Sequence, residues 1–398
     1  MLRPYVEALR LPGALAFSAS ALVARMPISM LSLGIVLAIE PAMGAYGPAG
    51  LVAGAALVGQ AAATPFQARA ADRIGQTRML VPLLAAHVIS LGTLVALIGH
   101  TTAAVLASVG LVVGTTLPQI GSLVRARWAF IQADSDRLHT AYALESAVDE
   151  FVFLAGWPLV TVLATAVQPV AGLIACLALT SLGCAALATQ RGTDPGPRPA
   201  ATPGSRAQPL ASATPGWLVL AFLLLGGVFG SIHVTTVAFA DQAGASGATG
   251  PILAVFALGS LLAGLATGAI RWRIGLRPRF AAGVAALTLA VLPLTLVRSV
   301  PLLGILLFVA AFAIAPTLAA GFSLVKEGVP AARTTEGLAW AFTALTAGKA
   351  LGSAAAGSAI DRYGASSAYV LSFTCGALAT AVCAAGWLQE RQPVRQRG

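Results

Sequence analysis

The chain has 398 residues, of which 58% are hydrophobic and only 10% are charged, and its formal net charge is +10. A soluble domain is roughly 25% charged, so this composition argues against a soluble protein and favours the lipid bilayer as solvent. The positive residues are scattered between apolar segments and form no single patch, which argues against nucleic-acid binding. The four cysteines lie in apolar segments without zinc-ligand spacing, which argues against a metal cluster or a disulfide framework.

Twelve apolar segments are long enough to cross a bilayer as helices, which takes about 20 residues. In chain order they are 12–40, 47–68, 79–99, 101–124, 140–166, 168–190, 216–241, 248–271, 279–297, 300–325, 335–358 and 366–389. Residues 191–215, between the sixth and seventh segments, are rich in Pro, Gly, Ser and Thr, as is typical of a flexible linker. We therefore predict a six-helix bundle at 1–190, a linker at 191–215 and a second six-helix bundle at 216–398.

Lysine and arginine are concentrated in every second gap between these segments, for example Arg125, Arg127 and Arg137 after the fourth. Loops rich in these residues stay on the cytoplasmic side of a membrane. The pattern therefore predicts a multi-pass protein of the plasma membrane with both termini in the cytoplasm. Arginine far outnumbers lysine, and Ala and Gly are abundant, which is typical of a high-GC bacterial source.

The two halves of the chain repeat short patterns at a nearly constant offset. The triplet RIG at 73–75 recurs at 273–275, and the pair Cys176 and Cys184 recurs 199 residues later. These matches fall at the same place in each six-helix half, which indicates a duplication. Parallel six-helix repeats are a known transporter architecture, with the substrate site between the halves near the membrane midplane. We predict an all-α integral membrane fold of two pseudo-symmetric six-helix bundles.

The gap after the second segment reads AADRIGQTR, and this motif resembles the loop signature of the major facilitator superfamily. The residues that match the family pattern are Asp72, Arg73, Gly75 and Arg78. Ala68 stands where the family has its first glycine, and topology, linker and repeat extend the resemblance over the whole chain. The resemblance implies a transporter working by alternating access, in which Asp72 latches one side near the eleventh segment and Arg125. The alternative is that these charges only anchor the topology.

Prolines and glycines inside the segments predict bends and close packing. The fifth segment contains Gly156-Trp157-Pro158, a match to the Gly-Pro motif of proton-coupled exporters in this superfamily that Trp157 interrupts. Pro118 and Pro316 predict bends in the fourth and tenth segments. Gly348 and Gly352 form a GxxxG step, which lets helices approach closely. The sequence DRYG at 361–364 is interpreted as a turn that connects two helices.

Ionisable residues inside the segments are the candidate functional residues. Asp149 lies about 15 Å along the fifth segment at 1.5 Å per residue, near the membrane midplane, and Glu150 follows it. Arg25 in the first segment and Lys349 in the eleventh lie at similar depth. A charge there costs roughly 2.5–3.5 kcal/mol, so these groups must pair, face water or be neutral. We expect Arg25 to pair with Asp149 or Glu150, and Lys349 takes the position equivalent to Glu150 in the repeat.

We predict that Asp149 or Glu150 binds a proton or a cationic substrate, and the alternative is a static network of ion pairs. Glu145 shares a helical face with Asp149 and is a further candidate for binding a proton or substrate; the alternative is that it lies shallower and faces cytoplasmic water. His233 in the seventh segment is a further candidate for carrying protons, with a purely structural histidine as the alternative. Arg25 and Lys349 are candidates for binding substrate.

The sequence has no HExxH motif, no paired nucleophile and base, and no GxxxxGK[ST] nucleotide loop. We therefore predict a secondary transporter and not an enzyme, with proton-coupled export of a drug or metabolite as its function. Uptake of a nutrient is the alternative, and a non-transporting membrane scaffold or sensor is the alternative from another class. We expect no cofactor, the proton as coupling ion, a small-molecule substrate and the lipid bilayer as partners, no nucleic acid, and a monomer.

Overall fold

The computed structural model describes residues 3–132, 135–197, 216–269, 274–328 and 334–391. The chain divides into two compact units, one made of residues 1–43 with 58–206 and the other of residues 44–57 with 207–398. The second predicted segment is therefore divided: its start, up to residue 57, belongs to the second unit, and the rest belongs to the first. The predicted boundaries at 190 and 216 stay a prediction, and most of the linker lies outside the described residues.

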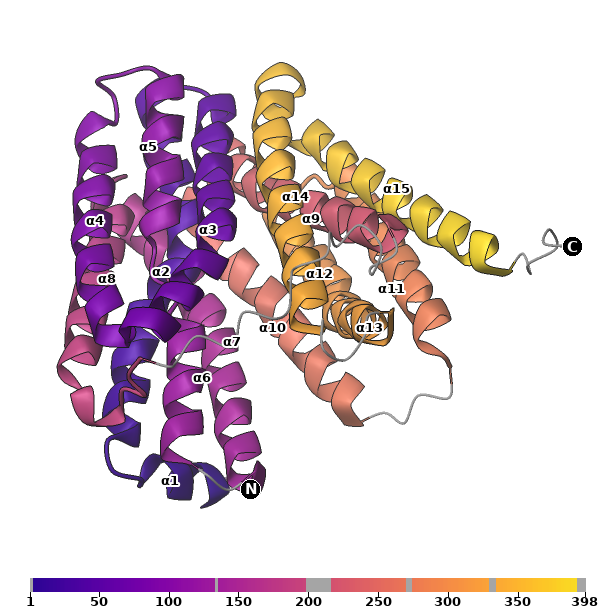
Figure 1. Cartoon of the computed structure of the whole chain (residues 1–398). Helices are drawn as coiled ribbons and strands as arrows, with labels where there is room; N and C mark the ends of the chain where they lie inside the picture. Colours follow the sequence, from indigo (N-terminus) through magenta and orange to yellow (C-terminus); the bar gives the residue numbers. More distant parts are fainter. Residues whose placement is uncertain (1–2, 133–134, 198–215, 270–273, 329–333, 392–398) are drawn as a thin grey trace, which may run out of the picture. The chain divides into compact units, whose positions relative to one another are not determined.

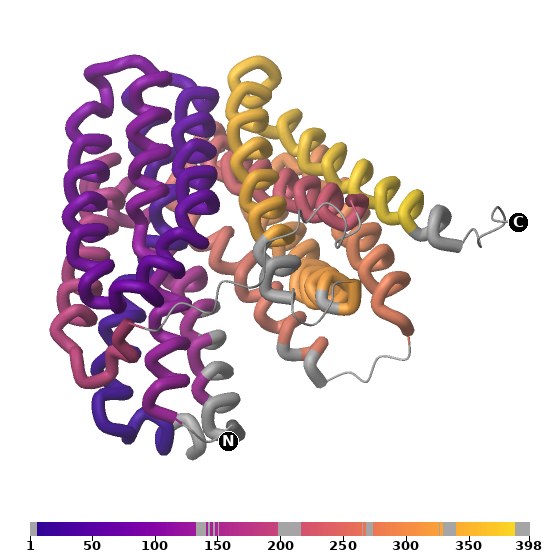
Figure 2. Tube along the Cα trace, viewed as in Figure 1, coloured from indigo at the N-terminus to yellow at the C-terminus, as the bar shows by residue number. Residues whose placement is uncertain are grey.

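The first unit is a bundle of helices that lie side by side (Figure 1). Its helices are α1 (Arg3–Leu9), α2 (Ala14–Met43), the second half of α3 (Tyr46–Ile74), α4 (Gln76–Leu97), α5 (Ala103–Thr116), α6 (Ile120–Ile131), α7 (Ser135–Ala166) and α8 (Ala171–Thr189), followed by the 3-10 turn η1 (Arg191–Thr193). Figure 2 traces these helices in chain order.

The second unit contains the start of α3 and the helices that follow the linker. These are α9 (Gly216–Gln242), η3 (Ser246–Ala248), α10 (Thr249–Ala269), α11 (Leu276–Val291), η4 (Leu292–Leu296), α12 (Val300–Ala311), α13 (Ile314–Gly328), α14 (Thr334–Tyr363) and α15 (Ala365–Arg391). A helix satisfies its own backbone hydrogen bonds, which is the requirement for crossing a bilayer. The apolar segments of the described chain are helical, as predicted, apart from breaks in the fourth and the tenth.

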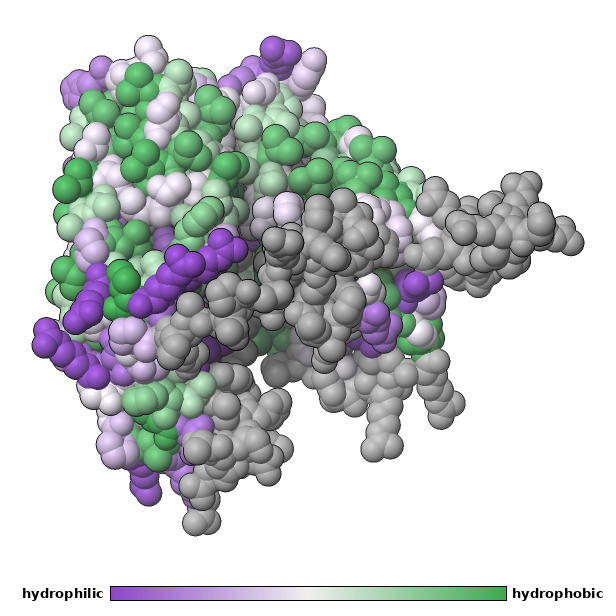
Figure 3. Space-filling model, in the orientation of Figure 1, coloured by the Kyte–Doolittle hydropathy of each residue, from purple (hydrophilic) through white to green (hydrophobic). Residues whose placement is uncertain are grey.

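Ten segments of the described chain are long and apolar enough to cross a membrane. On the face of the first unit seen in Figure 3, hydrophobic residues cover the helices between groups of hydrophilic residues. The predicted fifth and eleventh spans lie in α7 and α14, which are 32 and 30 residues long and are not among these ten. Within the described part of α7, the apolar stretch Phe151–Ala166 is shorter than a full span.

Two of the spans are broken helices. The fourth is divided into α5 and α6 at residues 117–119, where Pro118 lacks a backbone N–H. The amide of Gln67 holds this break: its Nε2 donates to the carbonyl oxygens of Thr115 (2.9 Å) and Leu117 (3.0 Å), and its Oε1 accepts from the Gln119 N–H (3.0 Å). The tenth span is divided between α12 and α13 just before Pro316. The bends predicted from these prolines are therefore complete interruptions.

Several predicted segment ends differ from the helix ends, and two of these differences affect the argument. The first segment was expected to begin at residue 12, but Gly13 adopts a φ of 80° and separates the short helix α1 from α2. The left-handed conformation is readily adopted only by glycine. The fourth segment was expected to end at residue 124, whereas α6 continues to Ile131. Arg125 and Arg127 are therefore helical residues and do not lie in a loop.

Candidate functional site

The helices α7 and α14 begin at Ser135 and Thr334, which is the 199-residue offset of the sequence repeat. Each carries ionisable residues in a membrane-spanning helix, where such residues are rare and usually have a role. The two helices lie in different units, so their environments are described in turn. Each unit therefore has its own group of candidate residues.

Arg25 of α2 joins both carboxylates predicted to share a face of α7. Its Nη1 donates to Oδ1 of Asp149 at 2.8 Å, and its Nη2 donates to Oε2 of Glu145. Residues four apart in a helix lie on the same side, one turn apart, which allows one guanidinium group to bind both. The structure therefore pairs Arg25 with Asp149, as expected from their depth, and adds Glu145 as a second partner.

Both carboxylates have further donors. The second oxygen of Asp149 accepts from Nη2 of Arg125 on α6 at 2.8 Å. Oε1 of Glu145 accepts from the indole Nε1–H of Trp128 at 2.8 Å and from the hydroxyl of Ser18 at 3.3 Å. Three helices of the first unit, α2, α6 and α7, are thus joined by one network with two arginines and two carboxylates.

The network has a dry end and an exposed end. The side chains of Arg25 and Glu145 are 1% and 0% exposed, whereas those of Arg125 and Asp149 are 36% and 38% exposed. Protons or substrate can therefore reach Asp149 more readily than Glu145. The alternative that Glu145 faces water is wrong, because Arg25, Trp128 and Ser18 surround its carboxylate.

The charges within this network balance, and that balance is what permits their burial. Removing one partner of a buried ion pair strands the other charge and costs about 3–5 kcal/mol. Asp149 and its exposed partner Arg125 are worth less by themselves, because solvent screens them. Glu150 lies in α7, but its side chain is outside the part that the structure describes, so its predicted role stays a prediction.

Lys349 of α14 has a different environment. Its Nζ lies 5.8 Å from the centre of the Phe229 ring on α9, which is a cation–π distance. No carboxylate among the described side chains lies within ion-pair distance of Lys349. A cation–π contact is worth about 0.5–2 kcal/mol, whereas a lysine within a membrane span costs roughly 2.5–3.5 kcal/mol. The contact with Phe229 therefore does not balance this charge.

His233 lies one turn beyond Phe229 on α9 and is half-buried. Its ring meets the Phe256 ring edge-on, with centroids 6.4 Å apart. This packing is compatible with the structural role, and the predicted proton-carrying role of His233 stays a prediction.

The predicted gating loop is a tight turn between α3 and α4. Gly75 makes this turn with a φ of 91°, which a residue with a side chain rarely adopts. Asp72, Arg73 and Arg78 are exposed, and no hydrogen bond or ion pair joins them to another described residue. Arg125 was expected near Asp72, but its guanidinium group binds Asp149 of α7.

Sequence reasoning missed a second polar cluster, which holds the residues after α8 against this loop. Arg127 is fully buried and donates to Oε1 of Gln76, to the Gln190 carbonyl oxygen and to Oγ1 of Thr193, each at 2.9 Å. A fourth bond at 3.1 Å reaches the Leu187 carbonyl oxygen. Arg127 was counted among the loop arginines that set topology, and no sequence signal separates it from them. The exact end of α6 decides its role.

Asp194 completes this cluster from outside the spans. Its Oδ2 accepts from the backbone N–H and the hydroxyl of Thr77, at 3.1 and 2.8 Å, and its Oδ1 accepts from the Gly196 N–H at 3.0 Å. Partial burial alone would raise the pKa of Asp194, but the hydrogen bonds from Gly196 and Thr77 and the charge of Arg127 hold it below its usual value. The first residues of the linker are thus tied to the start of α4.

Asp361 in the DRYG sequence does more than connect helices. Gly364, with a φ of 79°, makes the expected turn between α14 and α15. The Asp361 carboxylate also accepts the first backbone N–H groups of α3, from Tyr46 at 2.7 Å and Gly47 at 2.6 Å. This is helix-capping chemistry, in which a carboxylate accepts from the unpaired N–H groups at the start of a helix.

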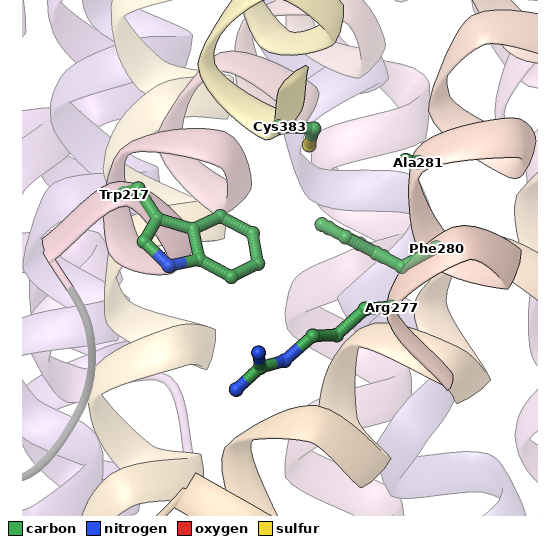
Figure 4. A pocket seen from close by; sticks show the side chains of 5 residues that line it. All are labelled: Trp217, Arg277, Phe280, Ala281 and Cys383. Carbon is green, nitrogen blue, oxygen red and sulfur yellow. The ribbon is translucent and has the colours of Figure 1, made fainter. Parts of the chain in front are cut away.

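A pocket in the second unit lies between α9, α11 and α15 (Figure 4). It is lined by Trp217, Arg277, Phe280, Ala281 and Cys383 and has a cavity volume of only about 10 Å³, room for about one water molecule. Sites for drug-sized molecules usually hold about 300–1,000 Å³. This pocket is smaller and contains none of the candidate charged residues, so we do not assign the transport site to it.

Comparison with known proteins identifies the family of the chain. The family model described as Major Facilitator Superfamily matches residues 14–339, whereas no curated protein sequence matches significantly. An autoinhibited POT-family peptide transporter has a similar structure, with a TM-score of 0.73, 13% identity and 95% and 96% of the two chains covered. A nucleoside transporter gives a TM-score of 0.73 at 14% identity, covering 93% and 98%.

A human organic anion transporter is similar at a TM-score of 0.60 and 16% identity, covering 93% of this chain and 98% of the other. At these identities the likeness of the structures shows the fold alone, while the family model covers most of the sequence. The fold is an all-α membrane fold, and the family works by secondary transport and not by enzymatic catalysis. The chain therefore belongs to the major facilitator superfamily, and it is a secondary transporter.

Proposed function

We propose that the chain exports a small molecule in exchange for protons, and that Asp149 is the group that binds the proton. The observation that supports this proposal is the position of Asp149, whose carboxylate joins Arg25 and Arg125 at 2.8 Å each while 38% of its side chain is exposed. A carboxyl group in contact with both water and two fixed cations can change the contacts of a membrane helix by gaining or losing one charge.

Proton binding to Asp149 would neutralise its carboxylate and release Arg125, while Arg25 would keep Glu145 as its partner. The contact between α6 and α7 would then weaken, and the buried contact between α2 and α7 would persist. Loss of the proton would restore the first contact. Such a pair of states is an equilibrium that a proton gradient and a substrate can both bias.

The test is transport with and without the Asp149 charge. We expect the wild-type chain to protect a pump-deficient bacterial host against at least one compound of a susceptibility panel, and Asp149→Asn to lose this protection at matched expression. The matched control is Glu327→Gln, which neutralises an exposed carboxylate at the end of α13. Equal protection and equal pH dependence in Asp149→Asn and wild type would refute the role of Asp149. Accumulation of a compound in the cells would instead indicate uptake.

We also propose that the carrier is a plasma-membrane monomer with both termini in the cytoplasm and with no cofactor besides the coupling proton. The alternation of arginine-rich gaps along the sequence supports this orientation. A protease-cleavable tag at the C-terminus should resist protease added to intact cells and be cut in inverted vesicles. The opposite pattern would reverse the proposed orientation.

A further inference from the structure

The helices α9 and α14 of the second unit pack in the same direction with their backbones in contact. Gly348 of α14 meets the Leu223 carbonyl oxygen, and Gly352 meets the Gly227 carbonyl oxygen one turn further along. Glycines allow this approach because they carry no Cβ. The predicted GxxxG step is therefore a contact with α9, and it fixes which residues of the two helices lie at the same level.

At one level three phenylalanines form a stack. The Phe222 and Phe322 rings have centroids 5.0 Å apart and an interplanar angle of 30°, and the Phe322 and Phe342 rings lie 4.4 Å apart at 26°. They come from α9, α13 and α14, so the sequence gives no sign that they meet. The last ring of the stack, Phe342, is 54% exposed. The stack thus ends in an aromatic surface that a planar group can cover.

Two turns beyond this level lies the unbalanced cation. Lys349 follows Phe342 by seven residues, so it lies on the same face of α14, roughly 10 Å further along the axis. On α9, Phe229 follows Phe222 by the same seven residues, and its ring is the one 5.8 Å from the Lys349 Nζ. One face of the second unit thus presents an aromatic surface and, at a fixed distance from it, a positive charge.

We propose that this face binds an amphipathic organic anion: Lys349 pairs with a carboxylate of the ligand, and the stack ending in Phe342 holds its flat apolar body. An anion between the helices balances the charge that the described carboxylates leave unbalanced. The aromatic surface and the lysine set the distance between ring and carboxylate in the ligand. This inference rests on the proposed transport function and names the class of substrate for it.

The test uses three naphthalene probes of similar shape: 2-naphthaleneacetate, its neutral amide and the corresponding primary amine. Binding is measured with the full-length protein in lipid nanodiscs. We expect the acid to bind best to the wild type, and Lys349→Met to weaken it about tenfold or more without changing the binding of the amide. Lys349→Arg keeps the charge and should keep most of the affinity for the acid.

The aromatic surface has a matched control on the same helix. Phe342→Leu should weaken binding of both acid and amide several-fold. Trp340→Leu should not, because Trp340 is 49% exposed but lies about 200° around the helix from Phe342. Equal losses of acid and amide in Lys349→Met, tighter binding of the amine than of the acid, or no binding of the acid would overturn the proposal.

These outcomes are separate from those of the proposed function. Binding that depends on Lys349 does not require proton coupling, so it can persist in Asp149→Asn. If transport depends on Asp149 but probe binding depends neither on Lys349 nor on the charge of the probe, the proposed export function stands and the anionic substrate is rejected. If the acid binds but transport does not depend on Asp149, the anionic ligand stands and the proposed role of Asp149 is rejected.

Discussion

The helices α7 and α14 begin at equivalent places in the sequence repeat, yet their charges are handled in opposite ways. On α7, Asp149 and Glu145 meet two arginines of their own unit, and each carboxylate has a cationic partner. On α14, Lys349 meets the face of Phe229 and no described carboxylate. A charge in a membrane span is rarely left unbalanced. The first helix is therefore balanced by protein groups, while the second leaves a charge for a ligand to balance.

The two helices are also attached differently. Polar contacts join α7 to α2 and α6, and Gly156 of α7 packs on the side chain of Ser29. Backbone contacts through glycines join α14 to α9. Hydrogen-bonded charges can exchange partners when a proton arrives, whereas close-packed backbones hold their spacing. We therefore propose that the change of state takes place in the first unit and that the second unit provides a rigid binding face.

The largest effect is expected from breaking the balance on the first helix. Arg25→Met removes the buried guanidinium group and strands Glu145, which is 0% exposed. We expect a loss of about 3–5 kcal/mol of stability, measured as a lower midpoint of denaturation for the purified protein. Addition of Glu145→Gln should recover part of the loss, because it removes the stranded charge.

The same kind of substitution in the other unit sharpens the comparison. Lys349→Met removes a cation without a described carboxylate partner, so the ligand-free protein should lose little stability or gain some. Arg10→Met, at an exposed position, should stay within about 0.5 kcal/mol of the wild type. A loss with Lys349→Met as large as that with Arg25→Met would mean that Lys349 is balanced within the protein.

An intermediate effect is expected where α14 meets α9. A Cβ added at Gly348 would meet the Leu223 carbonyl oxygen and lie 3.0 Å from the Gly226 Cα. Gly348→Ala should therefore separate the helices and cost about 1–3 kcal/mol, as overpacking does. The matched change Gly304→Ala, where the nearest atom is 4.0 Å away, should instead stabilise α12 by roughly 0.5–1 kcal/mol. Thermal denaturation of the two variants should shift in opposite directions, and equal shifts would contradict the packing argument.

Sequence periodicity and charge predicted the helices better than their contacts. The length of the apolar segments predicted the spans. The contact between Arg25 and Asp149 was predictable because the depth of each residue follows from its position along a regular helix. The role of Gln67 at the break before Pro118 was not predictable, because it depends on which backbone carbonyl groups lose their helical hydrogen bonds. The role of Arg127 depends on where α6 ends. The helix ends at Ile131 instead of residue 124, so Arg127 lies at the centre of a buried cluster and not in a loop.

Two other contacts between distant segments could not be predicted from the sequence. The stack of Phe222, Phe322 and Phe342 joins residues that are 100 and 20 positions apart, in a chain with 15 phenylalanines. Asp361 was recognised as a turn residue, but its bonds to the start of α3 depend on how two helix ends meet. The candidate charged residues were predictable because charges are rare in apolar segments. The stacked phenylalanines were not, because nothing in the sequence separates them from the other apolar residues.

A smaller effect is expected in the cluster that ties the linker to the first unit. Asp194→Asn should cost about 0.5–1.5 kcal/mol at pH 7, since it weakens the acceptor for Thr77. The folded protein lowers the pKa of Asp194, so its contribution is complete above the ordinary aspartate value. It is lost as the pH falls through the folded value. The difference in denaturation midpoint between wild type and variant should therefore vanish in acid, and a constant difference would contradict a charged contact.

The smallest effect on stability is expected at Asp72, and it separates a gate from a topological anchor. The side chain of Asp72 is exposed and has no described partner, so Asp72→Asn should change stability by less than about 0.5 kcal/mol. A latch that forms in another state of the cycle would still lower the transport rate at this unchanged stability, while binding of naphthaleneacetate at Lys349 stays as in the wild type. Glu327→Gln provides the matched control for loss of one exposed carboxylate. If Asp72→Asn transports at the wild-type rate, the loop charges act only on topology, and the change of state must be sought in the α6–α7 contact alone.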